Sequence, residues 1–229
     1  MNKSFIISPS IMCSTLSDTE SYVHAFEDCA VDAIHFDVMD GHYVPNIMLG
    51  VRDYAALKKA TNLPVDIHLM CTDPEGFVQI MQPAAGDWVS FHPETARNPH
   101  RLLIDLKARG CKTGIALSPG VPVSYIDELG TFLDFVLVMA VNPGFAGQKM
   151  LPDHLDKLHR VHEAVERYGH RIDIIVDGNT TVANSISMLK NGATGLVIGT
   201  SSAMKGGAAQ FSENYERYIL DIMRGLNEQ

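Results

Sequence analysis

The chain has 229 residues, of which 46% are hydrophobic and 20% charged, and its formal net charge is −9. This composition fits a globular protein of one large or two small domains, and the acidic balance argues against nucleic acid or an anionic membrane as partner. No apolar run is long enough to span a membrane, no signal peptide precedes the first strand, and the four cysteines form no Cys-x-x-Cys pair. We therefore expect reduced thiols in a cytoplasmic protein.

Short apolar runs alternate with amphipathic segments along the whole chain, a pattern typical of a parallel sheet wound with helices. The predicted strands are 5–8, 33–38, 65–70, 88–91, 113–117, 135–138, 173–176 and 195–198. The predicted helices are 18–30, 50–61, 74–84, 98–109, 123–129, 153–168, 180–191 and 207–225. Eight strands with eight following helices predict an α/β fold, a single-domain TIM (β/α)₈ barrel over residues 1–229. An open doubly wound sheet is the alternative, but Ser8-Pro9-Ser10 is not its Gly-rich fingerprint.

The second predicted strand carries polar residues where a buried strand should be apolar. Side chains alternate along a strand, so His35 and Asp37 share one face while Ile34, Phe36 and Val38 share the other. A buried imidazole and a buried carboxylate each need a partner. They find it either in one another, as a hydrogen-bonded pair in the core, or in a shared divalent metal.

Two further strand ends favour the metal. Asp66 and His68 repeat the acid–imidazole alternation on the next strand, and Asp177 ends the seventh. Barrel chemistry lies where strands end, so His35, Asp37, His68 and Asp177 can converge on one ion. Two nitrogens and two carboxylate oxygens suit zinc, our first choice, and also iron, manganese or cobalt. Asp66 lies one layer deeper, and we interpret it as a supporting carboxylate.

Asp37 and Asp177 also flank the predicted barrel bore from opposite sides. Two such carboxylates can remove a proton from one face of a substrate and return one to the other. A C–H proton leaves readily only beside a carbonyl, and a metal on the neighbouring oxygens would stabilise the resulting enediolate. The alternative interpretation of Asp177-Gly178, a plain turn, does not explain its place opposite Asp37.

Glycine-rich segments follow three of the predicted strands. Residues 142–148 read Asn-Pro-Gly-Phe-Ala-Gly-Gln, while Gly178-Asn179 and Gly199-Thr200-Ser201 follow the seventh and eighth strands. Glycines let backbone N–H groups approach an anion, and the usual phosphate site of a TIM barrel lies after those two strands. The segments predict a phosphate grip built from backbone amides. Flexible loops without a ligand are the alternative.

Together these residues resemble the ribulose-phosphate 3-epimerase family. The similarity covers nearly the whole chain, and its most specific stretch is His35-Phe36-Asp37-Val38-Met39-Asp40-Gly41-His42-Tyr43-Val44-Pro45-Asn46. The resemblance implies a homo-oligomer that acts on a phosphorylated ketose, with Asp37 and Asp177 as both metal ligands and acid–base pair. Further implied contacts are Ser10 and His68 with the substrate and Gly144, Phe145, Ala146, Gly147, Gly178, Gly199 and Thr200 with the phosphate. Met39, Met70 and Met139 would line the site, although spacing alone indicates core residues.

Three departures from the family pattern bear on the substrate. Enzymes for pentulose phosphates usually read Ala-Pro-Ser, Gly-Phe-Gly-Gly and Asp-Gly-Gly where this chain has Ser8-Pro9-Ser10, Gly144-Phe145-Ala146-Gly147 and Asp177-Gly178-Asn179. Ser10-Ile11-Met12-Cys13, His92-Pro93-Glu94-Thr95 and the Ala146 variant look closer to D-allulose-6-phosphate 3-epimerase. They favour interconversion of D-allulose 6-phosphate and D-fructose 6-phosphate, with the D-ribulose 5-phosphate and D-xylulose 5-phosphate pair as the alternative.

Other classes of protein fit less well. A barrel decarboxylase or hexulose-phosphate synthase would need an Asp-x-Lys-x-x-Asp pattern, and a Schiff-base aldolase would need a lysine inside the bore, which no strand end supplies. A non-catalytic sugar-phosphate-binding barrel has no use for acids on both faces of the ligand. The remaining histidines are expected on the surface: His24, His100, His154, His159, His162 and His170.

Overall fold

Eight parallel strands close into a barrel in the computed structural model, which describes residues 3–228. The first strand pairs with the last, and each barrel strand then pairs with the one before it in the chain, down to the second. A parallel bridge between Ser10 and His35 closes the ring. The predicted single-domain TIM barrel is thereby confirmed for the described residues. The strands are β1 (Ile6–Pro9), β2 (Ile34–Asp40), β4 (Val65–Met70), β5 (Trp88–Phe91), β6 (Lys112–Leu117), β7 (Phe135–Met139), β8 (Asp173–Asp177) and β9 (Gly195–Ile198).

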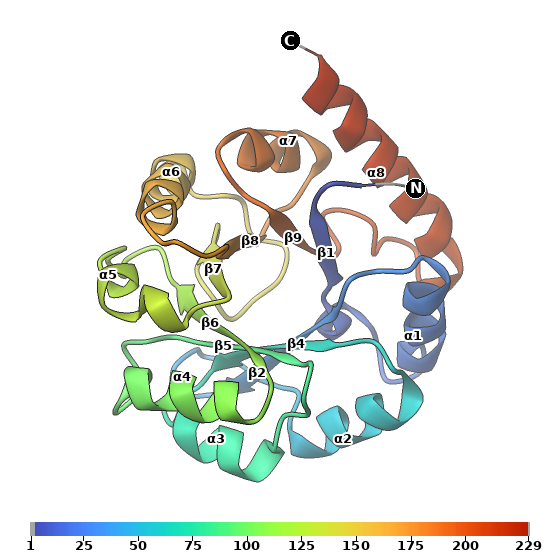
Figure 1. Cartoon of the computed structure of the whole chain (residues 1–229). Coiled ribbons are helices and arrows are strands. Elements are labelled where there is room, and N and C mark those ends of the chain that lie inside the picture. The colour runs from blue at the N-terminus through green and yellow to red at the C-terminus, as the bar shows by residue number, and fades with distance from the viewer. Residues whose placement is uncertain (1–2, 229) are drawn as a thin grey trace.

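The α-helices surround this barrel on the outside (Figure 1). They follow the strands in the predicted order, and their bounds differ from the predicted ones by a few residues. The helices are α1 (Thr19–Asp28), α2 (Val51–Ala60), α3 (Pro74–Met81), α4 (Pro99–Ala108), α5 (Tyr125–Leu129), α6 (His154–Val165), α7 (Val182–Lys190) and α8 (Phe211–Asn227). Short 3₁₀ turns cover Ile11–Cys13, Gly130–Phe132 and Ala208–Gln210. The sequence did not predict β3 (Ile47–Met48), which pairs antiparallel with the end of β2, because two residues are too few to show a period.

Several helices begin at a side chain that caps them. Asp73 precedes α3 and Asn98 precedes α4, and each accepts a hydrogen bond from the backbone N–H three residues later. Thr181 does the same for α7. Each such cap contributes about 1 kcal/mol to the free energy of unfolding. A proline at the first helical position of α3 and α4 has its φ already set for the helix.

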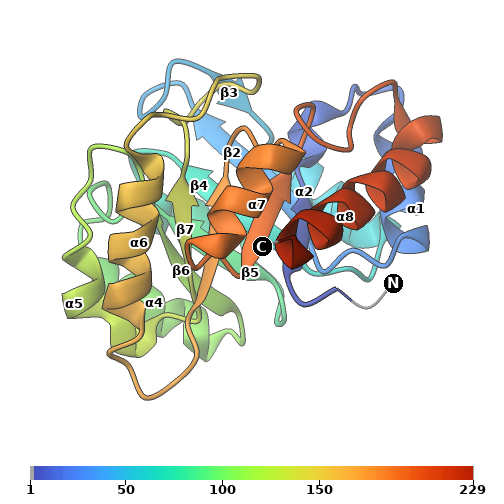
Figure 2. The same cartoon turned by 90° about the horizontal axis from the view of Figure 1, so that it is seen from above.

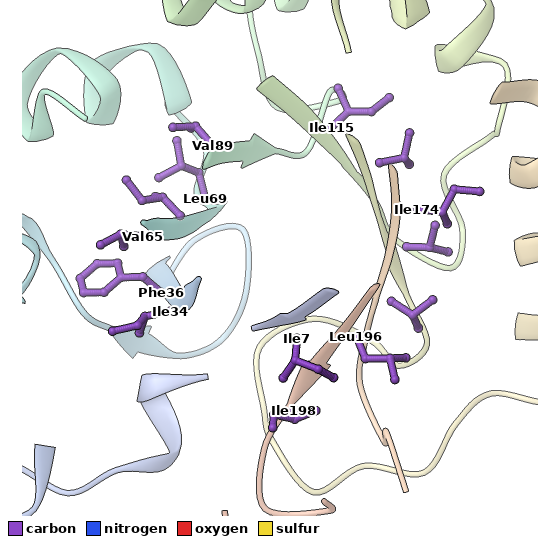
Figure 3. Packing of buried hydrophobic residues seen from close by; sticks show 14 of the residues in the cluster. Ile7, Ile34, Phe36, Val65, Leu69, Val89, Ile115, Ile174, Leu196 and Ile198 are labelled. Atoms are coloured by element: carbon purple, nitrogen blue, oxygen red, sulfur yellow. The ribbon is translucent and has the colours of Figure 1, made fainter. Parts of the chain in front are cut away.

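The hydrophobic core has two parts, because alternate strand residues point out of and into the barrel. Outward side chains such as Ile34, Phe36 and Leu69 point away from the ring of strands in Figure 3 and share one buried cluster with apolar residues of the helices. Inward side chains such as Trp88 and Phe135 fill the barrel interior. Burying one side chain of this size stabilises the fold by about 1.5–3 kcal/mol. Towards the carboxyl ends of the strands the inward positions become polar, and the candidate site lies there.

One expectation about the surface is wrong. His154 is only 2% exposed, although the sequence analysis placed it on the surface, and His162 is half-buried. His154 is the first residue of α6 and lies one helical turn before the buried Leu158, so it belongs to the apolar face of that helix. Burial lowers the pKa of His154 to about 4.

The four cysteines are free thiols. Within residues 3–228, none of the helices combines the length and the apolar character that a membrane crossing requires. The cytoplasmic location stays a prediction.

Candidate active site and metal centre

Four side chains from three strands lie together at the carboxyl end of the barrel. His35 and Asp37 come from β2, His68 from β4 and Asp177 from β8, and the β2–β4 register sets Asp37 beside His68. The Oδ1 atom of Asp37 is 3.2 Å from both His35 Nε2 and His68 Nδ1. The Oδ2 atom of Asp177 is 3.9 Å from each of the same two nitrogens. One donor atom from each residue lies within 4.8 Å of all the others.

This donor cluster (His35, Asp37, His68 and Asp177) matches what a divalent metal requires. Bonds of about 2.0–2.2 Å in a tetrahedral site hold neighbouring donors roughly 3.3–3.6 Å apart. The four acid–imidazole separations of 3.2 and 3.9 Å bracket that value, and all four donors lie within 4.8 Å of one another, so side-chain movements of about an ångström suffice. Two imidazole nitrogens with two carboxylate oxygens form a donor set that suits zinc and its neighbours among the transition metals.

A buried carboxylate orients His35 towards the cluster. The Oδ2 atom of Asp66 is 2.8 Å from His35 Nδ1 and accepts a second hydrogen bond from the hydroxyl of Ser8. All three residues are fully buried. A proton on Nδ1, donated to Asp66, leaves the lone pair of Nε2 facing the cluster. Asp66 thus lies where the sequence analysis put a supporting carboxylate.

The two acids of the cluster have opposite protonation preferences. Burial by itself would raise the pKa of Asp37, but His35 and His68 outweigh it and hold that pKa well below its ordinary value. Burial, helped by the negative charge of Asp37, raises the pKa of Asp177 to about 6. Asp37 therefore keeps its charge while Asp177 takes up a proton more readily. The hydroxyl of Ser10 donates to Asp37 Oδ2 at 2.7 Å and helps to hold the ionised form.

An open cavity with an empty volume of about 570 Å³ lies over the two acids. The predicted site residues that border it are Ser10, Asp37, Met39, Met70, Met139, Gly144, Phe145, Ala146, Gly147, Asp177, Gly178, Gly199 and Thr200. Of the predicted site residues, all of which are described, His35 and His68 do not border the cavity. The cavity therefore gives no support to a substrate contact by His68.

Backbone groups form much of the cavity rim. Among residues 3–228, the N–H groups of Gly147, Gly178 and Ser201 have no protein acceptor, and the lining includes neither lysine nor arginine. Gly178 has φ +108°, and a Cβ atom there would lie 2.6 Å from Val141 Cγ2. Only glycine fits this position without strain. We refer below to Gly144–Gly147, Gly178, Gly199 and Thr200 as the glycine rim.

Side chains fasten the longest loop of the rim. Asn46 Nδ2 donates to the carbonyl oxygen of Gly144 at 2.8 Å, which ties the loop after β7 to the segment beside β3. Both lie at the same end of the barrel in Figure 2. Asn179 adopts φ +51°, and its Oδ1 accepts hydrogen bonds from Met150 N and Asn184 Nδ2. Asn tolerates this left-handed conformation better than most residues. Asn179 thus joins the loop to α7 as well as bordering the cavity.

Sequence analysis did not predict the residues behind His68. His92 Nε2 lies 3.0 Å from His68 Nε2, and the other nitrogen of His92 lies 3.1 Å from the hydroxyl of Ser118. Burial and the neighbouring His68 hold the pKa of His92 well below its ordinary value. The signal was the polar His92-Pro93-Glu94 directly after β5, but nothing in the sequence shows which side chains it meets.

The chain is similar in sequence to known proteins over most of its length. A sequence model of the ribulose-phosphate 3-epimerase family matches residues 6–203. The Escherichia coli K12 protein named ribulose-phosphate 3-epimerase is 34% identical over 97% of this chain and 96% of its own length. The chloroplastic ribulose-5-phosphate-3-epimerase of Arabidopsis thaliana is 38% identical over 86% of this chain and 70% of its own length.

Solved structures resemble the chain in fold. A mutant tryptophan synthase α-subunit from Pyrococcus furiosus aligns with a TM-score of 0.64 at 14% identity, covering 96% of this chain and 98% of that one. N-(5′-phosphoribosyl)anthranilate isomerase from the same organism aligns with a TM-score of 0.61 at 12% identity, covering 96% of this chain and 99% of that one. At such low identity these similarities concern the barrel alone.

Proposed function

The chain belongs to the ribulose-phosphate 3-epimerase family, and from this premise we propose that it interconverts D-ribulose 5-phosphate and D-xylulose 5-phosphate. It is an isomerase of the carbohydrate-phosphate 3-epimerase type. The observation that carries the proposal is the pair of acids, Asp37 and Asp177, at the floor of a cavity whose rim offers backbone N–H groups. Such a site can invert a carbon next to a carbonyl while holding a distant phosphate.

The pentulose phosphate replaces the hexulose phosphate that the sequence variants favoured. The relatives described above are named as enzymes of ribulose phosphate, and none of the three sequence departures outweighs that. Asn179 was one of those departures, and its side-chain oxygen accepts a hydrogen bond from the backbone N–H of Met150, in the loop after β7. D-Allulose 6-phosphate remains the second candidate, on the strength of Ala146 in the cavity lining.

The mechanism rests on two acids that border the cavity. Asp37 removes the C3 proton from one face of the ketose, and Asp177 delivers one to the opposite face. In the reverse direction the two residues exchange roles. Ser10 holds Asp37 in place through its Oδ2 atom, which leaves Oδ1 facing the two imidazoles.

His35, Asp37, His68 and Asp177 would hold one divalent metal ion, for which zinc is our first choice over iron, manganese and cobalt. When bound, the metal supplies positive charge that stabilises the negative oxygens of the enediolate. Met39, Met70 and Met139 give the cavity an apolar wall, which keeps water from the reacting carbon.

The phosphate would bind at the glycine rim. The free N–H groups of Gly147 and Gly178, together with that of Ser201 next to the rim, can donate to phosphate oxygens without a basic side chain. This explains how a chain of net charge −9 can bind an anion.

The predicted homo-oligomer stays a prediction. Leu16 is fully exposed and Ile47 is 78% exposed, and both border one surface groove. Apolar surface of this kind is commonly covered by a partner. Sedimentation of the wild-type chain against an Ile47→Lys variant would test whether this groove lies in an interface.

The substrate is tested by measuring kcat/KM on D-ribulose 5-phosphate and D-allulose 6-phosphate with one preparation of known metal content. We expect the pentulose phosphate to be the better substrate. A higher kcat/KM for the hexulose phosphate would reverse the assignment while leaving the reaction type intact. Failure to epimerise either compound would contradict the proposed function itself.

A further inference from the structure

A continuous series of polar contacts runs from the donor cluster to the rim of the barrel. His68 Nε2 lies 3.0 Å from His92 Nε2, and His92 Nδ1 lies 3.1 Å from the Ser118 hydroxyl. Ser118 Oγ lies 2.9 Å from the hydroxyl of Tyr43, which donates to Glu94 Oε1 at 2.7 Å. We call His92, Ser118, Tyr43 and Glu94 the tautomer relay. These residues come from the ends of β5 and β6 and from the segment after β2.

The carboxylate at the end of the relay sets the direction of every hydrogen bond in it. An ionised Glu94 only accepts, so the single hydrogen of the Tyr43 hydroxyl goes to it. Tyr43 must then accept from Ser118, and the Ser118 oxygen in turn accepts from His92 Nδ1. A neutral imidazole with its hydrogen on Nδ1 offers a lone pair on Nε2.

The consequence reaches the donor cluster in one more step. His92 Nε2, carrying a lone pair, must accept a hydrogen from His68 Nε2. His68 then has no hydrogen on Nδ1, the nitrogen that lies 3.2 Å from Asp37 Oδ1 and 3.9 Å from Asp177 Oδ2. The lone pair of that nitrogen faces the place where a metal would bind.

The reverse direction is less favourable. It would require Ser118 to donate to His92 Nδ1 and Tyr43 to donate to Ser118, which would leave the Glu94 carboxylate without the Tyr43 hydrogen. Glu94 Oε1 also lies 3.8 Å from His92 Nδ1. A negative charge at that distance attracts a hydrogen to Nδ1, which reinforces the first direction.

We propose that Glu94, acting through Tyr43, Ser118 and His92, fixes the tautomer of His68 and so presents Nδ1 to the metal. Glu94 is a positioning residue, because no member of the relay is among the described residues that border the cavity. The proposal rests on the metal-binding role of His68 under the proposed function. Asp66 fixes the tautomer of His35 directly, through one hydrogen bond. The tautomer of His68 is fixed by a carboxylate four hydrogen bonds away.

The first test observes the tautomers themselves. Long-range ¹H–¹⁵N spectra of the ¹⁵N-labelled, zinc-loaded full-length protein separate protonated from unprotonated ring nitrogens. We expect His92 to carry its hydrogen on Nδ1 and His68 to carry its hydrogen on Nε2. A hydrogen on His92 Nε2, or zinc on His68 Nε2, would overturn the proposal.

The second test measures zinc affinity by competition with a chelator. Tyr43→Phe and Ser118→Ala each interrupt the relay, and we expect each to weaken zinc binding roughly 10-fold, as loss of an outer contact to a ligand usually does. Glu94→Gln keeps an acceptor oxygen without the charge, and its affinity should fall between those variants and wild type. Thr95→Val is the matched control, because among residues 3–228 its hydroxyl bonds only to the backbone oxygen of His92.

Two results of the affinity measurement would contradict the relay. Zinc affinity at the wild-type level in both Tyr43→Phe and Ser118→Ala, with thermal melts showing folded protein, would contradict the relay. An equal loss in Thr95→Val would also contradict it, since the loss would then not require the side-chain contacts. Both readouts are independent of turnover, so a protein with the expected tautomers but without epimerase activity would count against the proposed function alone.

Discussion

The two acids of the donor cluster and the glycine rim border one cavity, yet the chain builds the cluster and the rim differently. His35, Asp37 and His68 are at most 3% exposed and lie on strands whose register the barrel ladder fixes. The rim lies in loops, and its Phe145 is 52% exposed. Groups that must be placed within a fraction of an ångström are better held by strands, whereas an anion can be gripped by backbone amides of a loop.

The cluster and the rim also carry different free-energy costs. The cluster buries polar atoms that would be unfavourable without partners, so each imidazole has one partner inside the cluster and another behind it. The rim instead holds its backbone at positive φ, with Gly144 at +117° and Gly178 at +108°. If this division is correct, damage to the cluster should remove the chemistry, and damage to the rim should chiefly weaken substrate binding.

Removal of the metal should have the largest effect. Chelation is expected to abolish epimerisation, and readdition of one divalent ion should restore it, because the enediolate loses its stabilising charge. His68→Ala should lower both metal content and rate, while His159→Ala, an exposed histidine of α6, should change neither. Metal analysis by mass spectrometry alongside rate assays checks this. Full activity in protein shown to be metal-free would contradict the assignment of the cluster.

Removal of the substrate's phosphate should have the next largest effect, through the rim. Each hydrogen bond to a charged group contributes about 1.5–3 kcal/mol, so losing two of them should reduce kcat/KM roughly 10²–10⁴-fold. Comparison of ribulose 5-phosphate with free ribulose measures it. Similar kcat/KM values for both sugars would mean that the glycine rim is not a phosphate site.

A single methyl group on the rim should have a smaller effect. Gly178→Ala introduces a Cβ atom 2.6 Å from Val141 Cγ2 at φ +108°, which should destabilise the fold by about 1–3 kcal/mol and raise KM more than it lowers kcat. The control is Gly120→Ala, where a Cβ atom meets no described neighbour within 4 Å. Thermal melts and steady-state kinetics check both. Unchanged KM and stability in Gly178→Ala would show that this glycine is not required.

Much of the fold and of the cluster followed from the sequence because strand alternation is a local property. His35 and Asp37 are two residues apart and must share a face, and the barrel then places them near the ends of β4 and β8. Asp66 could be recognised as a supporting group by the same counting.

The rest depends on contacts between loops, for which local spacing carries no information. Tyr43, Ser118 and Glu94 follow three different strands, and their meeting depends on how the loops fold over the barrel mouth. The burial of His154 was missed for a different reason, because a polar residue at the start of a helix is usually solvated, although its spacing to Leu158 places it on the apolar face of α6. The substrate preference also rested on loop residues, and Asn179 proved to hold the loop together.

The most direct test of the two-acid mechanism is solvent exchange at C3 in deuterated water, with the metal content of each variant measured first. Asp177→Asn and Asp37→Asn each retain an oxygen for the metal and should slow epimerisation by about 10²–10⁴-fold. We expect Asp177→Asn to exchange the C3 hydrogen of one epimer, through Asp37, without inverting it, and Asp37→Asn to do so for the other epimer. Interconversion of the epimers at near wild-type rates by both metal-loaded variants would contradict the account.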